Sequence, residues 1–252
     1  MGTWICHLRV AEKITNSLPD LNFPAFYAGS IAPDCGMPDE TWTNFDPPKT
    51  VTHYLVQGES NNHIQDLDFY HAYKSGLDSP LASSDASFLW GYYFHLVTDA
   101  LWVELIDPAT KYVWAHLFVE DKFKAIDLIK DDWYGLDHRF LRSNPGWEPW
   151  KIFYQLELPP IPIDHIPANA INFQFDYIRK YYSEVNAGRI LDRPFPYLNE
   201  ATMQRVVRDS ATASLKIYHL LRNNVELNGA FSAISLLSAE ERLPYPPPLG
   251  DL

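Results

Sequence analysis

The chain has 252 residues and a formal net charge of −12, and 46% of its residues are hydrophobic while 21% are charged. A chain of this length buries about 70–75% of the surface that its unfolded form exposes, so it folds without disulfides, and this composition excludes wholesale disorder. The acidic balance argues against long nucleic acids and anionic membrane surfaces as partners. With only two cysteines, Cys6 and Cys35, and no apolar run of about 20 residues, we expect a soluble cytoplasmic protein without a transmembrane segment.

Helical periodicity opens the chain. Apolar residues recur at helical spacing from Trp4 to Leu18, and Pro19 predicts the end of this helix. Residues 19–62 are rich in Pro, Asp, Asn and Gly and show little periodicity, which predicts a long ordered loop or several short turns. A short helix is expected over 66–77.

The middle of the chain carries the strongest helical pattern. A helix is expected over 84–106, with Ser84 or Asp85 as its N-cap. An Asp-Pro pair then predicts the N-cap and first turn of a helix over 107–130. A further short helix is expected over 132–141.

Prolines interrupt residues 143–168, which predicts no helix there. Helices are expected again over 165–186 and, with Asn199 as the N-cap, over 200–222. Because no strand ladder and no internal repeat is recognisable, the predicted fold class is all-α.

Two pairs of a histidine and a carboxylate stand out within these helices. His95 and Asp99 lie four residues apart among apolar neighbours, so both side chains project from one helix face. His116 and Glu120 repeat this spacing on the next predicted helix, which a turn joins to the first as an antiparallel pair. A buried hydrogen bond explains one such pair equally well, but two facing pairs supply the ligands from which helical bundles build metal sites.

Three further candidates lie upstream: His7 on the first helix, Asp34 in the tight loop GSIAPDCG, and His53 in PPKTVTHY. Taken singly, each histidine is better explained by packing and Asp34 by a turn. Their order along the chain, together with the two pairs, favours a metal site. Cys6 and Cys35 adjoin two of these residues, and packing as small buried side chains is the preferred interpretation of both.

This succession of residues resembles the zinc-dependent phospholipase C family, whose multi-helix bundle is shared with the single-strand-specific zinc nucleases. The matching pieces are G-x-I-A-P-D, T-H-aromatic and G-Y-x-x-H-L-x-T-D, and they lie between residues 7 and 120. The resemblance implies a trinuclear zinc cluster that hydrolyses phosphate esters. The chain is also expected to form a single helical domain over 1–242, and its proline-rich end over 243–252 is expected to be a solvated tail, which is preferred over an arm that binds a partner.

Carried over residue by residue, the resemblance assigns seven zinc ligands in three sets. They are Asp34, His53, His95 and Asp99 for a first zinc, His7 with a bridging Asp99 for a second, and His116 with Glu120 for the third. Imidazole and carboxylate groups are suitable zinc ligands. Asp34 and Asp99 are the catalytic candidates, and the resemblance implies that Asp34 also accepts a proton from the attacking water.

Two positions depart from the family's pattern. Secreted members begin with a tryptophan whose free amine and carbonyl bind the second metal, whereas Trp4 is internal here and offers only its carbonyl. The family also places a histidine six residues after the bridging aspartate, where this chain has Leu105. Glu104, Asp107 and His138 are candidate substitutes, so we expect between one and three zinc ions.

The sequence therefore predicts a zinc-dependent hydrolase of phosphate esters that uses a metal-activated water. Its substrate is a small phosphorylated compound, namely a phosphodiester or phosphomonoester of a small molecule, lipid head group or nucleotide. Lys49, just before His53, either meets the substrate phosphate or is solvated. The alternative is a degenerate, catalytically weak relative in which a metal-stabilised helical module binds a ligand or a protein partner. A di-iron oxidase is disfavoured because no Glu-x-x-His pair lies on a predicted helix.

Overall fold

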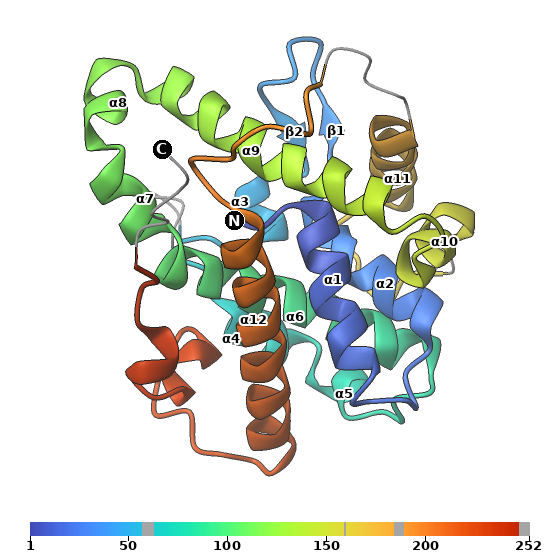
Figure 1. The fold of residues 1–252 in the computed structure, drawn as a ribbon. Helices are drawn as coiled ribbons and strands as arrows, with labels where there is room; N and C mark the ends of the chain where they lie inside the picture. Colours follow the sequence, from blue (N-terminus) through green and yellow to red (C-terminus); the bar gives the residue numbers. More distant parts are fainter. Residues whose placement is uncertain (57–62, 159, 184–188, 247–252) are drawn as a thin grey trace.

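The computed structural model describes residues 1–56, 63–158, 160–183 and 189–246, and the fold is all-α, as predicted (Figure 1). The helices are α1 (Trp4–Thr15), α2 (Phe23–Ile31), α3 (Lys49–Thr52), α4 (Asp66–Ala72), α5 (Lys74–Leu77), α6 (Ser84–Leu105), α7 (Asp107–Val113), α8 (Ala115–Glu120), α9 (Lys122–Ser143), α10 (Glu148–Gln155), α11 (Ala168–Ser183) and α12 (Glu200–Arg222). The described residues also form three short 3-10 helices, η1 (Ala32–Asp34), η2 (Ala233–Leu236) and η3 (Glu240–Arg242). Two short strands pair antiparallel, β1 (Met37–Pro38) and β2 (Phe45–Asp46). None of the described helices combines the length and hydrophobicity that a bilayer crossing requires.

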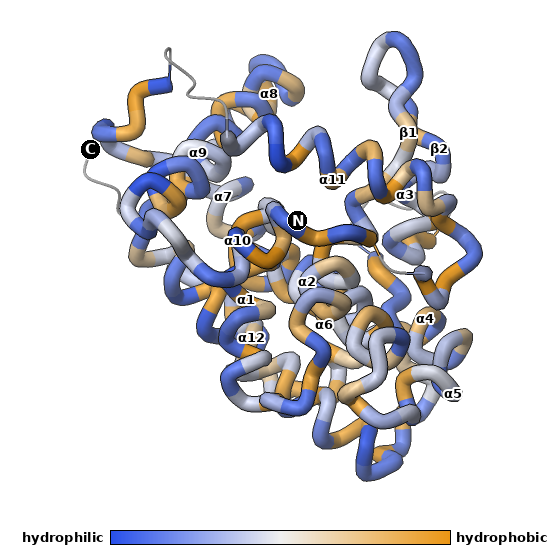
Figure 2. Tube along the Cα trace, turned by 90° about the vertical axis from the view of Figure 1, so that its right-hand side faces the viewer, coloured by the Kyte–Doolittle hydropathy of each residue, from blue (hydrophilic) through white to orange (hydrophobic). Residues whose placement is uncertain are grey.

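Helix α6 forms the centre of the fold, and residues 86–102 of it are buried without interruption. Helices α1, α2, α4, α5 and α12 all pack against it, so it is apolar on every side. The hydroxyl of Ser83 accepts a hydrogen bond from the backbone N–H of Ala86, which makes Ser83 the N-cap, one residue before the predicted start. The outer helices, such as α12, alternate between hydrophobic and hydrophilic stretches, as Figure 2 shows.

Two glycines allow α2 and α6 to cross in backbone contact. A Cβ atom added at Gly29 would lie 2.0 Å from the carbonyl oxygen of Phe88, and one added at Gly91 would lie 2.2 Å from that of Phe26. No other residue type fits either position without moving a helix. This crossing also brings the carbonyl of Ser30 against α6, where the metal-ligand candidates lie.

The predicted loop over 19–62 is wrong for residues 23–31, which form α2. Asn22 caps this helix by accepting a hydrogen bond from the N–H of Ala25. The segment FPAFYAGSI is apolar all round and buried over residues 25–31, so it lacks the periodicity that reveals a half-exposed helix. The first helix is also shorter than predicted and ends at Thr15.

The predicted helices over 107–130 and 132–141 are wrong in their boundaries. The chain turns at Trp114 and Asp121 to give α7, α8 and α9, and α9 runs through residue 131 without interruption. Asp121 caps α9 by accepting hydrogen bonds from the N–H groups of Phe123 and Lys124. Because a good internal N-cap competes with continuation of the preceding helix, the break falls there.

The later segments differ in two places. Within 143–168, Pro149 lies in the first turn of α10, where its missing N–H costs nothing, so a proline starts a helix that we expected it to prevent. Helix α12 has the predicted bounds, and Asn199 accepts from the N–H of Thr202. The predicted solvated tail is wrong at Tyr245, which is buried and donates its N–H to the carbonyl of Leu105. Tail residues 247–252 lie outside the described residues.

Asp66, at the start of α4, holds the 231–236 segment to the core. Its carboxyl accepts hydrogen bonds from the hydroxyl of Ser232 and from the N–H of Ala233 at 2.8 Å. Burial raises the pKa of Asp66 to about 7, against 3.8 for a free side chain. Between these pH values the folded state keeps a proton that the unfolded state has lost. The free energy of unfolding therefore falls as pH rises through this window, by up to about 4 kcal/mol, and is level above it.

The variant Asp66→Asn is expected to remove this pH-dependent fall. An amide stays neutral, accepts from the N–H of Ala233 and donates to the hydroxyl of Ser232. Urea unfolding of both proteins at about pH 5 and about pH 8 measures the difference. The exposed Asp68→Asn on the same helix is the matched control and should keep the wild-type pH dependence. If Asp66→Asn keeps it as well, the carboxyl of Asp66 does not hold a proton.

Candidate metal centre

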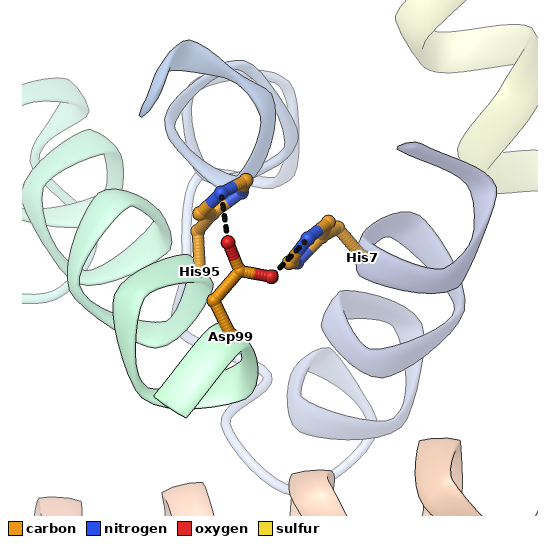
Figure 3. A group of neighbouring side chains, drawn as sticks. All are labelled: His7, His95 and Asp99. Carbon is orange, nitrogen blue, oxygen red and sulfur yellow. Dashed lines mark ion pairs between the residues drawn. The ribbon is translucent and has the colours of Figure 1, made fainter. Parts of the chain in front are cut away.

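Three buried side chains from two helices meet at the centre of the fold (Figure 3). His95 and Asp99 lie one turn apart on α6, as their spacing predicts, and His7 faces them from α1. The carboxylate of Asp99 lies between the two rings, with Oδ1 3.3 Å from Nε2 of His7 and Oδ2 3.6 Å from Nε2 of His95. The two imidazole rings stack with centroids 3.7 Å apart.

Asp34 and His53 complete the cluster from the other side. Asp34 ends η1, directly after α2, and His53 follows the last residue of α3. Nε2 of His53 is 3.3 Å from Oδ1 of Asp34, 3.3 Å from Nε2 of His95 and 3.5 Å from Oδ2 of Asp99. The structure thus brings together five of the seven predicted ligands in two groups that share His95, one with His7 and Asp99 and one with Asp34 and His53.

The second group, taken together with Asp99, has ligand separations close to those of a zinc site. A tetrahedral zinc ion with bonds of about 2.0–2.1 Å separates neighbouring ligand atoms by about 3.3–3.4 Å. Among Oδ1 of Asp34, Nε2 of His53, Nε2 of His95 and Oδ2 of Asp99, four of the six separations are 3.3, 3.3, 3.5 and 3.6 Å. Two imidazole nitrogens and two carboxylate oxygens are also a donor set that zinc accepts.

Hydrogen bonds to the far ring nitrogens orient the two histidines. Nδ1 of His95 donates to the carbonyl of Ser30 at 2.8 Å, so in the neutral ring the lone pair is on Nε2. Nδ1 of His53 lies 2.9 Å from the hydroxyl of Thr52. A histidine whose Nδ1 is bonded to the protein and whose Nε2 points at a carboxylate is arranged as metal-ligating histidines are.

Several buried polar atoms of this cluster have no hydrogen-bond partner among the described residues. They are Nδ1 and Nε2 of His7 and Oδ2 of Asp99. An unsatisfied buried polar atom costs about 1–3 kcal/mol. A cation bound between these residues offsets that cost, so the donor set and its unmet bonding capacity both fit a metal ion.

The electrostatics of the cluster are those of a cation site. Burial lowers the pKa of His7 and, with help from the Lys49 ammonium, lowers that of His53 to about 4, so both rings are neutral at neutral pH. Burial alone would also lower the pKa of His95, but Asp99 and Asp34 raise it above its usual value. Although burial opposes ionisation, His7 and His95 hold the pKa of Asp99 well below its usual range. The ionised carboxylates of Asp34 and Asp99 therefore favour binding of a cation between the ligands.

The sequence did not reveal the residues that orient the ligands but lie far from them along the chain. The N–H of Gly2 donates to Oδ1 of Asp99 at 2.7 Å, and Gly2 packs on the ring of His7. The ring of Trp4 packs against Tyr134 and Tyr181, and Trp4 lines the cavity beside the cluster. A backbone N–H or carbonyl leaves no pattern in a sequence, so only the cap signal of α1 at Thr3 could have pointed to this end of the helix.

The structure does not bring His116 and Glu120 to either group. Both side chains are exposed on α8, which has no buried residue and packs on α7 and α9. The turns at Trp114 and Asp121 break the long helix that would have faced α6. The assignment of His116 and Glu120 as zinc ligands stays a prediction.

The candidate substitutes for the missing ligand at Leu105, and the two cysteines, lie mostly outside the cluster. Leu105 is buried, and of its proposed substitutes only Asp107 lines the cavity beside the cluster. His138 packs on the rings of Tyr181 and Tyr182 instead. The two free cysteines are buried, and burial raises the pKa of Cys6 to about 12 and that of Cys35 well above its usual value. Both are therefore thiols at neutral pH and belong to neither ligand group.

A cavity of about 740 Å³ opens over the cluster. Asp34 and His53 line its inner end together with Gly2, and Phe118 and Ile126 are among the apolar residues of the outer wall. Of the clustered ligands Asp34 is the most accessible, with 15% of its side chain exposed. A small molecule in this cavity therefore reaches the cluster at Asp34.

The fold and the cluster define an all-α protein with a buried His and Asp donor set suited to zinc. Residues 6–104, which carry the whole cluster, match the family model of zinc dependent phospholipase C. The matched segment contains His7, Asp34, His53, His95 and Asp99 and ends before α8. No curated protein and no solved structure matches the chain. This match and the His and Asp groups of the cluster support a metal-dependent hydrolase with zinc as its metal.

Proposed function

We propose that this protein is a zinc-dependent hydrolase of phosphate esters. The observation that carries the proposal is the convergence of Asp34, His53, His95 and Asp99 beneath a cavity, with four of their ligand-atom separations between 3.3 and 3.6 Å. These four residues would hold one zinc ion, and His7 would hold a second together with Asp99. One to three ions are compatible with the donors of the chain.

A zinc ion bound here supplies a Lewis acid that lowers the pKa of a bound water toward neutrality and polarises a phosphoryl oxygen. Asp34, at the boundary between the buried cluster and the cavity, is positioned to accept the proton of the attacking water. Lys49, whose ammonium lies 3.5 Å from Oδ1 of Asp34, adds positive charge where a phosphate enters. The N–H of Gly2 and the carbonyl of Ser30 fix Asp99 and His95, so the ligands are held before the substrate arrives.

The substrate of this reaction is a small phosphodiester or phosphomonoester, from a small molecule, a lipid head group or a nucleotide. We further propose that residues 1–242 form a single domain with the tail 243–252 attached to it, and that the protein acts in the cytoplasm. The packing of Tyr245 on α6 and α12 supports a tail that is anchored to this domain.

Metal removal tests the proposal directly. Protein purified without chelator should contain one to three zinc ions by mass spectrometry and hydrolyse bis(p-nitrophenyl) phosphate. Treatment with a chelator should remove both the zinc and the hydrolysis, and added zinc should restore them. A chelator-treated protein that keeps full hydrolysis, or an untreated one without bound metal, would overturn the proposal.

The second candidate is a degenerate relative that holds one structural zinc and binds a ligand without turnover. The exposure of His116 and Glu120 and the burial of Leu105 at an expected ligand position favour it, because they leave a third metal without described ligands. One zinc ion per chain and no turnover over a panel of phosphomonoesters and phosphodiesters would support this candidate over the first.

A further inference from the structure

The cavity over the metal cluster is cationic although the chain as a whole is acidic. The whole chain has 20 basic and 32 acidic residues, not counting histidine. The cavity instead is lined by four lysines against two aspartates, Asp34 and Asp107. The lysines are Lys49, Lys111, Lys122 and Lys130.

Helix α9 supplies two of these lysines from a single face. Its cavity-lining residues are Lys122, Ile126, Ile129, Lys130, Trp133 and Tyr134, whose spacing matches one side of a helix. Lys122 and Lys130 are eight residues apart, which places their Cα atoms about 12 Å apart along the helix axis. The two isoleucines lie between them, so this stretch of the wall is apolar between two cations.

The two lysines of α9 differ from the other two in their partners. Lys49 lies 3.5 Å from Asp34 and Lys111 lies 3.3 Å from Asp107. Lys122 and Lys130 form no ion pair with any described residue. Burial and the Lys49 charge lower the pKa of Lys130, while Asp127 and Asp34 raise it, so Lys130 lies near Asp34 at the metal end of the cavity. Lys122 is left as an unneutralised cation at the far end.

We propose that the substrate carries a second anionic group, a phosphate or a carboxylate, that binds Lys122 while the reacting phosphate lies near Lys130, Lys49 and the metal cluster. The inference rests on the proposed function, since the reacting phosphate is the one that this function requires. The apolar stretch at Ile126 and Ile129 accommodates the part of the substrate between the two anions. Charge-assisted hydrogen bonds from lysines to both ends then select against substrates with a single anion.

A non-hydrolysable ligand pair tests this without relying on turnover. Octane-1,8-bisphosphonate has two anionic ends separated by a length close to that between the two lysines, and octylphosphonate has one. Calorimetric titration of the zinc-loaded protein should give an affinity about tenfold higher for the bisphosphonate. Lys122→Gln should abolish that advantage and leave the affinity for octylphosphonate unchanged. Glutamine also removes a cation from the N-terminal end of α9, where the helix dipole disfavours it, so this variant is expected to fold.

Lys124→Gln is the matched control, because Lys124 is exposed on the same turn of α9 but does not line the cavity. It should keep the wild-type preference for the bisphosphonate. Equal affinities for the two ligands in the wild type, or an equal loss in Lys122→Gln and Lys124→Gln, would overturn the inference. Substituting propane-1,3-bisphosphonate, which is too short to reach both ends, should remove the advantage, and retention of it would also count against the two-point arrangement. Titration measures binding alone, so the two proposals can fail separately. If the protein prefers the bisphosphonate through Lys122 but hydrolyses no phosphate ester, only the proposed function is overturned.

Discussion

Replacing His95 by alanine is expected to lower the zinc affinity by more than about 100-fold and to reduce phosphodiester hydrolysis to near background. His95 is the residue that both ligand groups share, and its Nε2 lies 3.3 Å from that of His53 and 3.6 Å from Oδ2 of Asp99. Loss of a partner that only orients a ligand already costs about 10–100-fold, so loss of the ligand itself should cost more. Zinc content after dialysis against a metal buffer and the rate of bis(p-nitrophenyl) phosphate hydrolysis measure the two effects.

Two further variants make this result specific. His219→Ala removes an exposed histidine from α12 and should change neither zinc content nor rate. His116→Ala separates the described arrangement from the one that the family resemblance implies. Unchanged zinc content fits an exposed His116, whereas loss of one ion per chain would show that α8 moves to bind a third metal. Full zinc content and activity in His95→Ala would contradict a metal site at His95.

The variant Gly91→Ala is expected to destabilise the fold by about 3 kcal/mol, although alanine is normally the better helix former by about 1 kcal/mol. The added Cβ would lie 2.2 Å from the carbonyl oxygen of Phe26 and 2.9 Å from the N–H nitrogen of Ser30, so α2 and α6 must separate. For a chain of this size the change corresponds to a fall in Tm of about 6–12 °C. Thermal unfolding in the presence of a chelator measures it without a contribution from bound metal.

Gly29→Ala should give a loss of similar size, because its Cβ would lie 2.0 Å from the carbonyl oxygen of Phe88 on the opposite side of the same crossing. Gly76→Ala is the control, since its Cβ would meet only the end of the Leu89 side chain, which can move. The crossing also holds the carbonyl of Ser30 2.8 Å from Nδ1 of His95. Gly91→Ala is therefore expected to weaken zinc binding as well. A Tm equal to that of Gly76→Ala would show that α2 and α6 are not in backbone contact.

Whether a helix could be predicted from the sequence depends on how much of its surface is buried. Helix α12 is half exposed, so its apolar residues recur at helical spacing, and both its bounds and its Asn199 cap were predictable. Helix α2 is buried over residues 25–31, so it has no polar face and no period, and it was predicted as a loop. The region over 107–130 has a helical pattern throughout, and the breaks at Trp114 and Asp121 depend on a cap that competes with the continuing helix.

The sequence by itself determined the all-α class and the residue types of the metal cluster. The spacing of His95 and Asp99 on one helix is a local property, and the family's motifs supplied the order of His7, Asp34 and His53 along the chain. Tertiary structure decided which of these residues meet. Glycines at the crossing of α2 and α6 set the depth at which Ser30 reaches His95, and the turns before and after α8 leave His116 and Glu120 exposed. Distances between residues far apart in the chain depend on helix crossings and on turns between helices, which helical periodicity does not encode. The lysine-lined cavity arises in the same way, because α7 and α9 place positive charge beside a cluster whose ligands lie on α1 and α6, directly after α3 and at the end of η1.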